Sequence, residues 1–224
     1  MKYIVASSKV WSRIPMAELL SKRTGQEFIQ LSQESNLSID YLDKIKPKYI
    51  FFPHWSYIIP SEIYERYECV IFHMTDLPFG RGGSPLQNLI SRKIYETRVS
   101  ALRCVKELDA GPIYLKRPLS LYGTAQEIFM RSNAIIEDMI VSLIDGAPVP
   151  YEQSGEPVVF ERRNERDGNI AELETLGQVH DFIRMLDADG YPAAFLETDK
   201  FRFDFSRSSI RSDHILANVV IKRK

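Results

Sequence analysis

The sequence predicts an α/β protein with a Rossmann-like, mostly parallel sheet that has helices on both faces, followed by a small C-terminal helix-and-β appendage. Two observations favour the sheet. Strand-like and helix-like patterns alternate through the first ~145 residues. The strand-like runs are continuously apolar, as in YIFF (Tyr49–Phe52) and CVIF (Cys69–Phe72), which is typical of parallel strands buried on both faces. After the PVP at 148–150, residues 151–170 are rich in charged and turn-forming residues, which indicates the start of the appendage.

The first half of the chain alternates regularly. An apolar run forms the first strand, an amphipathic pattern follows it, and Pro53 ends the central strand. The expected elements are a strand at Tyr3–Ala6, a helix at Ile14–Arg23, a strand at Glu27–Leu31, a helix at Leu42–Ile45, a strand at Tyr49–Phe52, a helix at Ile63–Tyr67 and a strand at Cys69–Phe72.

Helix signals mark the next part of the chain. Ser84 and Pro85 are suited to the N-cap and first positions of a helix. TAQE (Thr124–Glu127) is a capping box, and it opens a long amphipathic helix closed by Gly146. Strands are expected between these helices, at Val99–Val105 and Ile113–Leu115.

The predicted domains are a catalytic domain over 1–150 and a small helix/β subdomain over 151–224. TLGQ (Thr175–Gln178) is a second capping box and starts the subdomain's helix. Short β-like segments follow at Ala193–Leu196, Phe201–Phe205 and Leu216–Ile221.

The composition is that of a globular protein and limits the partners. With 29 basic and 30 acidic residues among 224, the net charge of −1 gives no electrostatic reason to expect nucleic-acid binding. No stretch approaches the ~20 apolar residues that a membrane helix needs, and the N-terminus lacks a signal-peptide pattern. Cys69 and Cys104 lie in apolar runs without metal-ligand spacing, which favours buried reduced thiols. A cytoplasmic protein is expected.

Two histidines follow predicted strands directly. His54 comes after YIFFP, and His73 comes after CVIF. Because ligands of doubly wound sheets bind beyond the carboxyl ends of the strands, both positions favour a functional role over a packing role. His180 and His214 lie in the appendage and are interpreted as packing or surface residues.

Three further groups could act with these histidines. Asp109, in the turn ELDAGPIY, could fix an imidazole tautomer and favour its protonated form, although Asp–Ala–Gly is also common turn chemistry. The GRGGSP segment offers Arg81 and the backbone amides of Gly82 and Gly83 to an anionic group of a substrate. Ser8 and Lys9, after the first strand, are a second candidate phosphate contact.

The middle of the chain resembles the folate-dependent formyltransferase family. That family's signature is Asn–x–His–x–(Ser/Thr)–x–Leu–Pro, then a glycine loop and an LD–x–G turn. The chain matches it with FHMTDLPFG (72–80) and LDAG (108–111). The RRNERDGNI segment and IRMLDADGYPAAF (Ile183–Phe195) resemble the C-terminal region of sugar N-formyltransferases.

The resemblance implies transfer of a formyl group from N10-formyltetrahydrofolate to a primary amine, without a metal. His73 and Asp109 would act on the formyl group and move the proton. The pterin would lie beside residues from two loops, namely Trp55, Ser56, Tyr57 and Ile58 from the first and Val105, Glu107 and Leu108 from the second. The family's asparagine falls at Ile71, which has no hydrogen-bonding side chain. We therefore expect His54 to take over that polar role.

The expected acceptor is a nucleotide-linked amino-dideoxy sugar, a UDP-4-amino-4,6-dideoxy-N-acetyl sugar of a pseudaminic-acid-type pathway of surface polysaccharide biosynthesis. Methionyl-tRNA and glycinamide ribonucleotide are the alternative acceptors. A metal-dependent enzyme built on His54, His73 and Asp109 is a further alternative, as is a binding protein that has lost catalysis. The sequence leaves a homodimer open and gives no reason for a membrane partner.

Overall fold

The structure is a computed structural model, and it describes residues 1–9, 11 and 14–224. Its main sheet has six strands in the order β2-β1-β3-β4-β6-β7. The pairs β1–β2, β1–β3 and β3–β4 are parallel, whereas β4–β6 and β6–β7 are antiparallel. The mostly parallel sheet is confirmed, and only β6 runs against the other five strands. The strands are β1 (Lys2–Ala6), β2 (Glu27–Leu31), β3 (Tyr49–Phe52), β4 (Cys69–His73), β6 (Glu96–Arg103) and β7 (Ile113–Ser120).

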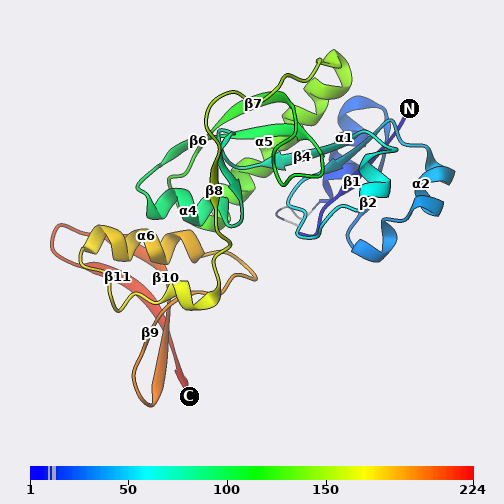
Figure 1. Cartoon of the computed structure of the whole chain (residues 1–224). Helices are drawn as coiled ribbons and strands as arrows, with labels where there is room; N and C mark the ends of the chain where they lie inside the picture. The colour runs from blue at the N-terminus through cyan, green and yellow to red at the C-terminus, as the bar shows by residue number, and fades with distance from the viewer. Residues whose placement is uncertain (10, 12–13) are drawn as a thin grey trace.

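Helices cover both faces of this sheet (Figure 1). Side chains alternate along β4, so that Val70 and Phe72 enter one apolar cluster and Cys69 enters the other. The first cluster packs against α1, α4, α5 and α6, and the second against α2 and α3. The helices are α1 (Met16–Thr24), α2 (Ile39–Ile45), α3 (Ser61–Tyr64), α4 (Pro85–Ser91), α5 (Ala125–Gly146) and α6 (Leu176–Leu186), with 3-10 turns at Glu34–Asn36 and Glu165–Gly168.

The C-terminal part adds two small sheets. β5 (Phe79–Gly82) pairs in parallel with β8 (Val158–Phe160), so the segment expected to be only a glycine turn contains a short strand. β9 (Ala194–Glu197), β10 (Phe201–Ile210) and β11 (Ile215–Arg223) form an antiparallel sheet, which projects away from the main sheet in Figure 1.

Helix α6 joins the appendage to the main body. Its Ile183 and Met185 lie in the same apolar cluster as Leu89 of α4. Arg184 is buried beside them and donates to Asp181 Oδ1 at 2.7 Å, and Asp181 accepts a hydrogen bond from the Tyr95 hydroxyl at 2.7 Å. The subdomain predicted over 151–224 therefore shares its core with the rest of the chain.

Local capping signals account for the starts of two helices, α5 and α6, as the sequence predicts. Thr124 and Thr175 both form the expected capping boxes, with Glu127 and Gln178 respectively. Ser84 does not cap α4, because its backbone has a left-handed φ of 47° and its hydroxyl accepts the N–H of Arg163 instead. Ser84 thus occupies the predicted N-cap position without making a side-chain capping bond, and Pro85 begins the helix as predicted.

Candidate active site

His73 and Asp109 form a buried pair at the end of β4. Their exposed fractions are 8% and 6%. Nδ1 of His73 lies 3.5 Å from Oδ2 of Asp109, and Nε2 lies 2.7 Å from the carbonyl oxygen of Gly80. Both ring nitrogens thus face oxygen acceptors, so an imidazole protonated on both nitrogens would donate to both. The structure brings together the two residues that the sequence singled out for acid–base chemistry.

The β5 segment contacts the turn that carries Asp109. The backbone N–H of Gly82 donates to Asp109 Oδ2 at 3.0 Å. Asp109 has a left-handed φ of 52°, a backbone conformation in which Asp is tolerated better than most residues. A Cβ on Gly111 would lie 1.9 Å from the carbonyl oxygen of Arg103. A side chain at the glycine of the LD–x–G pattern would therefore clash with the backbone, which explains why glycine stands there.

The glycines of GRGGSP allow the chain segment around Phe160 to approach closely. A Cβ on Gly82 would lie 2.5 Å from the Phe160 carbonyl oxygen, and one on Gly83 would lie 2.6 Å from Cα of Arg162. The N–H of Gly83 donates to Phe160 O at 3.0 Å. The amides of Gly82 and Gly83 are thus bonded within the chain, and their contact with a substrate anion stays a prediction.

Gln153 is a residue of this site that the sequence did not indicate. Its Nε2 donates to the backbone oxygens of Asp109 and Gly111, both at 2.8 Å. Its Oε1 accepts from Nε of Arg81 at 3.1 Å and from Nη2 at 2.7 Å. Arg81, expected to bind substrate, therefore has two of its nitrogens engaged by Gln153. Gln153 lies in a polar linker far along the chain, where no local pattern marks it.

His54 lies in an aromatic environment apart from the pair. Its ring meets Trp11 and Phe129 edge-on, with centroids 6.1 Å from each. Its Nε2 is buried and has no hydrogen-bond partner in the part of the chain that the structure describes. Burial lowers the pKa of His54 from its ordinary value of 6.5 to about 4, so the ring is neutral at pH 7. Within residues 1–9, 11 and 14–224, no hydrogen bond or ion pair joins His54 to His73 or Asp109.

The loops after β1 and β3 are tied together by side chains predicted to bind ligands. The Ser8 hydroxyl donates to the His54 backbone oxygen at 2.8 Å and accepts the Ser56 N–H at 3.0 Å. Nζ of Lys9 lies 5.6 Å from the centre of the Tyr191 ring, where a cation is favoured by the ring's face.

The two loops predicted to hold a pterin lie on one face of the sheet. Trp55, from the first loop, and Cys104, which precedes the second, pack into the same apolar cluster. Ile58 is 87% exposed and Leu108 is 69% exposed. An apolar surface is therefore available on both loops. Cys104 and Cys69 are buried and free, as predicted, and burial raises the pKa of both thiols.

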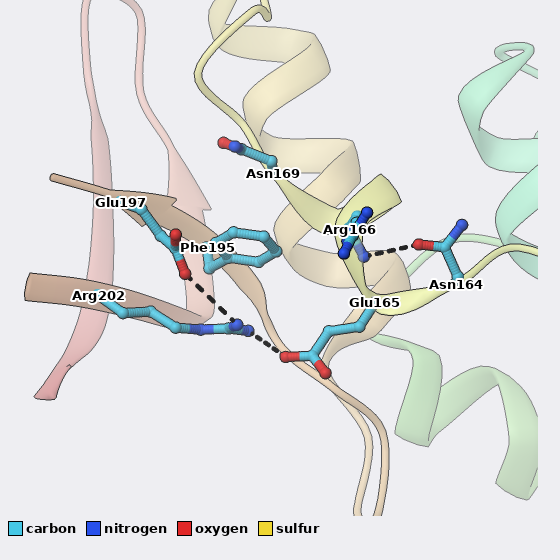
Figure 2. A pocket seen from close by; sticks show the side chains of 7 residues that line it. All are labelled: Asn164, Glu165, Arg166, Asn169, Phe195, Glu197 and Arg202. Atoms are coloured by element: carbon cyan, nitrogen blue, oxygen red, sulfur yellow. Dashed lines mark hydrogen bonds and ion pairs between the residues drawn. The ribbon is translucent and has the colours of Figure 1, made fainter. Parts of the chain in front are cut away.

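A surface hollow of about 620 Å³ lies elsewhere, in the C-terminal part (Figure 2). Arg202 stacks on Phe195 there, 3.9 Å from the ring centre, and pairs with Glu165 at 2.7 Å. None of its lining residues comes from the His73–Asp109 site. We assign these contacts to the packing of the C-terminal sheet.

Neither a metal-ligand cluster nor a membrane-spanning helix occurs within residues 1–9, 11 and 14–224. No group of three or more His, Cys, Asp and Glu side chains there is placed to hold a metal ion. The metal-dependent alternative thus lacks the ligand cluster it requires. None of the helices in these ranges has the length and apolar character needed to cross a membrane.

Known proteins resemble this chain in both sequence and structure. The family described as methionyl-tRNA formyltransferase, C-terminal domain, matches residues 165–222. The methionyl-tRNA formyltransferase of Leifsonia xyli subsp. xyli is 29% identical over 139 residues, which cover 59% of this chain and 46% of that protein. The chain spans about half the length of the curated relatives it matches.

Solved structures extend the comparison. A methionyl-tRNA formyltransferase from Clostridium thermocellum is 46% identical, with a TM-score of 0.96 and 100% coverage of both chains. The formyltransferase PseJ from Anoxybacillus kamchatkensis, in complex with UDP-4,6-dideoxy-4-formamido-L-AltNAc and tetrahydrofolate, is 17% identical. Its TM-score is 0.58, and the match covers 71% of this chain and 85% of that one, a likeness of fold.

The relatives named for methionyl-tRNA are thus more similar to this chain than PseJ, the reverse of the order expected from the sequence. The formyltransferase signature, its buried His73–Asp109 pair and the full-length likeness agree with one another. The chain belongs to the folate-dependent formyltransferase family.

Proposed function

We propose that the protein transfers a formyl group from N10-formyltetrahydrofolate to a primary amine. The observation that carries this proposal is the buried His73–Asp109 pair in a chain with 46% identity to a formyltransferase over its full length. The pair supplies a general acid–base group and a carboxylate that orients it, which are the groups that acyl transfer to an amine requires.

The donor would lie along the loops 55–58 and 105–108. The exposed side chains of Ile58 and Leu108 offer apolar contacts, and the buried Nε1 of Trp55 has no hydrogen-bond partner among the described residues. PseJ, which has the same fold, was solved with tetrahydrofolate. When bound, N10-formyltetrahydrofolate supplies the activated formyl group, whose oxygen gains negative charge as the amine attacks. The chain's own residues must stabilise that charge and accept a proton.

We assign the stabilisation of this negative charge and the uptake of the proton to His73, assisted by Asp109. In the structure its Nε2 is engaged by Gly80 O, so His73 would donate to the formyl oxygen after exchanging that bond for one to the substrate. Asp109 holds Nδ1 and stabilises the imidazolium that forms when a proton is taken up. The carboxylate is fixed in turn by the N–H of Gly82.

His54 is proposed as a neutral donor in place of the asparagine that is missing at Ile71. Its pKa of about 4 keeps the ring uncharged, and its Nε2 has no hydrogen-bond partner among residues 1–9, 11 and 14–224. A buried donor of this kind is costly unless a partner is supplied, and a bound substrate is one such partner.

Methionyl-tRNA is the first candidate acceptor, because relatives of that description match this chain at 29% and 46% identity. A nucleotide-linked amino sugar is the second candidate. Residues 151–224 contain 11 basic and 14 acidic side chains, which does not favour binding of a polyanion such as tRNA. Arg81, Ser8 and Lys9 are the proposed contacts for the acceptor's anionic groups.

A panel of acceptors tests the proposal. Purified protein is incubated with N10-formyltetrahydrofolate and, separately, with methionyl-tRNA, glycinamide ribonucleotide, and UDP- and dTDP-linked amino sugars. Products are read by mass spectrometry for the addition of one formyl group. Formylation of any acceptor that depends on the folate supports the reaction class, and its identity decides between the candidates. Failure with every acceptor, combined with no binding of tetrahydrofolate by calorimetry, would refute the proposal.

A further inference from the structure

Two bridges connect the Asp109 turn to the β5 segment. The first runs directly from the Gly82 N–H to the Asp109 carboxylate, at 3.0 Å. The second runs through Gln153, which receives hydrogen bonds from Arg81 and donates to the backbone oxygens of Asp109 and Gly111. The side-chain amide of Gln153 thus contacts both segments: its oxygen accepts from the β5 segment, and its nitrogen donates to the Asp109 turn.

The backbone on both sides of Gln153 is held in place. Tyr151 exchanges two backbone hydrogen bonds with Ile113, at 2.7 and 3.0 Å, as an isolated bridge beside β7. Five residues beyond Gln153, the N–H of Val158 donates to the backbone oxygen of Pro78 at 3.2 Å. Gln153 is therefore delivered to the Asp109 turn by a segment that is itself tied to the core sheet.

The Asp109 turn needs such support. Its φ of 52° is a sparsely populated conformation for a residue other than glycine, and its carboxylate must stay opposite Nδ1 of His73. Hydrogen bonds to the backbone oxygens of residues 109 and 111 restrain the turn on both sides of the strained position. They act on the backbone and leave the carboxylate free to face His73.

We propose that Gln153 is a positioning residue for formyl transfer, which sets the place of the Asp109 carboxylate by clamping the turn from the linker between α5 and β8. This inference rests on the proposed function and adds a residue to it. Displacement of a reacting group by about 1 Å can lower turnover by about 100-fold. Loss of the clamp should therefore reduce kcat while substrate affinity is kept.

The key variant is Gln153→Glu. It retains an acceptor for Arg81 but replaces the amide donor with a carboxylate facing two backbone oxygens, so it breaks the clamp and keeps the Arg81 contact. Gln153→Ala removes both contacts. The matched control is Glu152→Ala, the exposed neighbour in the same linker.

Steady-state kinetics give the first readout. We expect kcat to fall about 10- to 100-fold in Gln153→Glu and Gln153→Ala, with KM for donor and acceptor within about twofold of wild type. Glu152→Ala should match wild type. A raised acceptor KM with unchanged kcat would overturn the proposal, because Gln153 would then act through Arg81 on binding.

The second readout does not require activity. The Gly82 amide is bonded to the Asp109 carboxylate, so its hydrogen-exchange rate, measured by NMR, reports whether that carboxylate is in place. We expect the Gly82 amide to exchange about tenfold faster than wild type in Gln153→Glu and at the wild-type rate in Glu152→Ala. The exchange rates of the β1 amides should be unchanged in both variants. Equal Gly82 exchange in the two variants would overturn the clamp. If the wild type formylates no acceptor, the proposed function fails, and the exchange of Gly82 still decides the role of Gln153.

Discussion

His73 and Asp109 lie 3.5 Å apart between Nδ1 and Oδ2, and both are buried more than nine-tenths. A carboxylate at this distance from an imidazole acts in a region of reduced dielectric, where the interaction of charges is stronger than in water. Each residue also has a second partner that fixes its orientation, Gly80 O for His73 and the Gly82 N–H for Asp109. The pair is thus preorganised.

Replacing either member of the pair should abolish most turnover. We expect His73→Ala and Asp109→Asn each to lower kcat by about 10²- to 10⁴-fold. Initial rates of formyl transfer measure the effect, and far-UV circular dichroism checks that the fold is retained. His214→Ala and Asp213→Asn, at exposed positions, are the controls. Wild-type-like rates in both His73→Ala and Asp109→Asn would disprove the assignment.

His54 is tested by a substitution that preserves its packing. Phenylalanine keeps an aromatic ring against Trp11 and Phe129 and removes both ring nitrogens, in exchange for a slightly larger ring. If Nε2 donates to the reacting group, His54→Phe should lose about tenfold or more in kcat, with KM little changed. An unaltered kcat would assign His54 to packing alone.

The stability of the protein should depend on pH through His54. Its folded pKa of about 4 lies below the unfolded value of 6.5, so between these values the unfolded chain binds a proton that the folded chain does not. Stability is therefore lost as the pH falls from 6.5 towards 4, by about 2 kcal/mol at pH 5. Urea denaturation at pH 7 and pH 5 should show this loss in the wild type and less of it in His54→Phe. Equal losses in the two proteins would contradict the prediction.

Gly82→Ala should destabilise the fold, because its φ is 98° and the new Cβ would meet a backbone oxygen at 2.5 Å. We expect a loss of about 2 kcal/mol or more in the free energy of unfolding, measured by urea denaturation. Gly146→Ala is the matched control. A Cβ there has nothing within 4 Å, and alanine in a helix should be neutral or stabilising by up to about 1 kcal/mol. A similar result for both variants would contradict the steric argument.

Arg184→Met should loosen the C-terminal part. The substitution leaves Asp181 buried without its cation and removes the donor to the carbonyl oxygens of Leu121 and Gly123. Breaking a buried pair from one side costs about 3–5 kcal/mol. Urea denaturation measures the loss, and Arg211→Met, at an exposed position, should stay within about 0.5 kcal/mol of wild type. A stability of Arg184→Met equal to that of Arg211→Met would refute a structural role for the pair.

Local rules in the sequence were reliable where local contacts decide the structure. Thr124 and Thr175 cap their helices as expected, since each meets a partner three residues away. The strand before His73 was predicted correctly because its apolar run is buried on both sides. His73 and Asp109 were found through the family signature and by their places after a strand and in a turn.

Contacts between distant segments could not be predicted in this way. Ser84 has the right residue type for a cap, but the packing of its loop against residues 162–163 bends its backbone out of the capping conformation. The apolar run of β6 does not reveal its direction, so its antiparallel pairing was unforeseen. Gln153 acts on Asp109 across the fold, and no spacing rule connects a linker glutamine to such a turn.

The placement of Gln153 and Phe160 late in the chain has a consequence for biosynthesis. A protein emerges from the ribosome with its N-terminus first. His73 and Asp109 therefore leave the exit tunnel before the linker and β8, which hold them in place in the folded protein. A nascent chain that stops short of residue 153 has the complete strand of His73 and the Asp109 turn, but it lacks the clamp and the partner strand of β5. The reactive pair therefore reaches its final geometry only after residues 153–160 have been synthesised, which is later than the six strands of the central sheet.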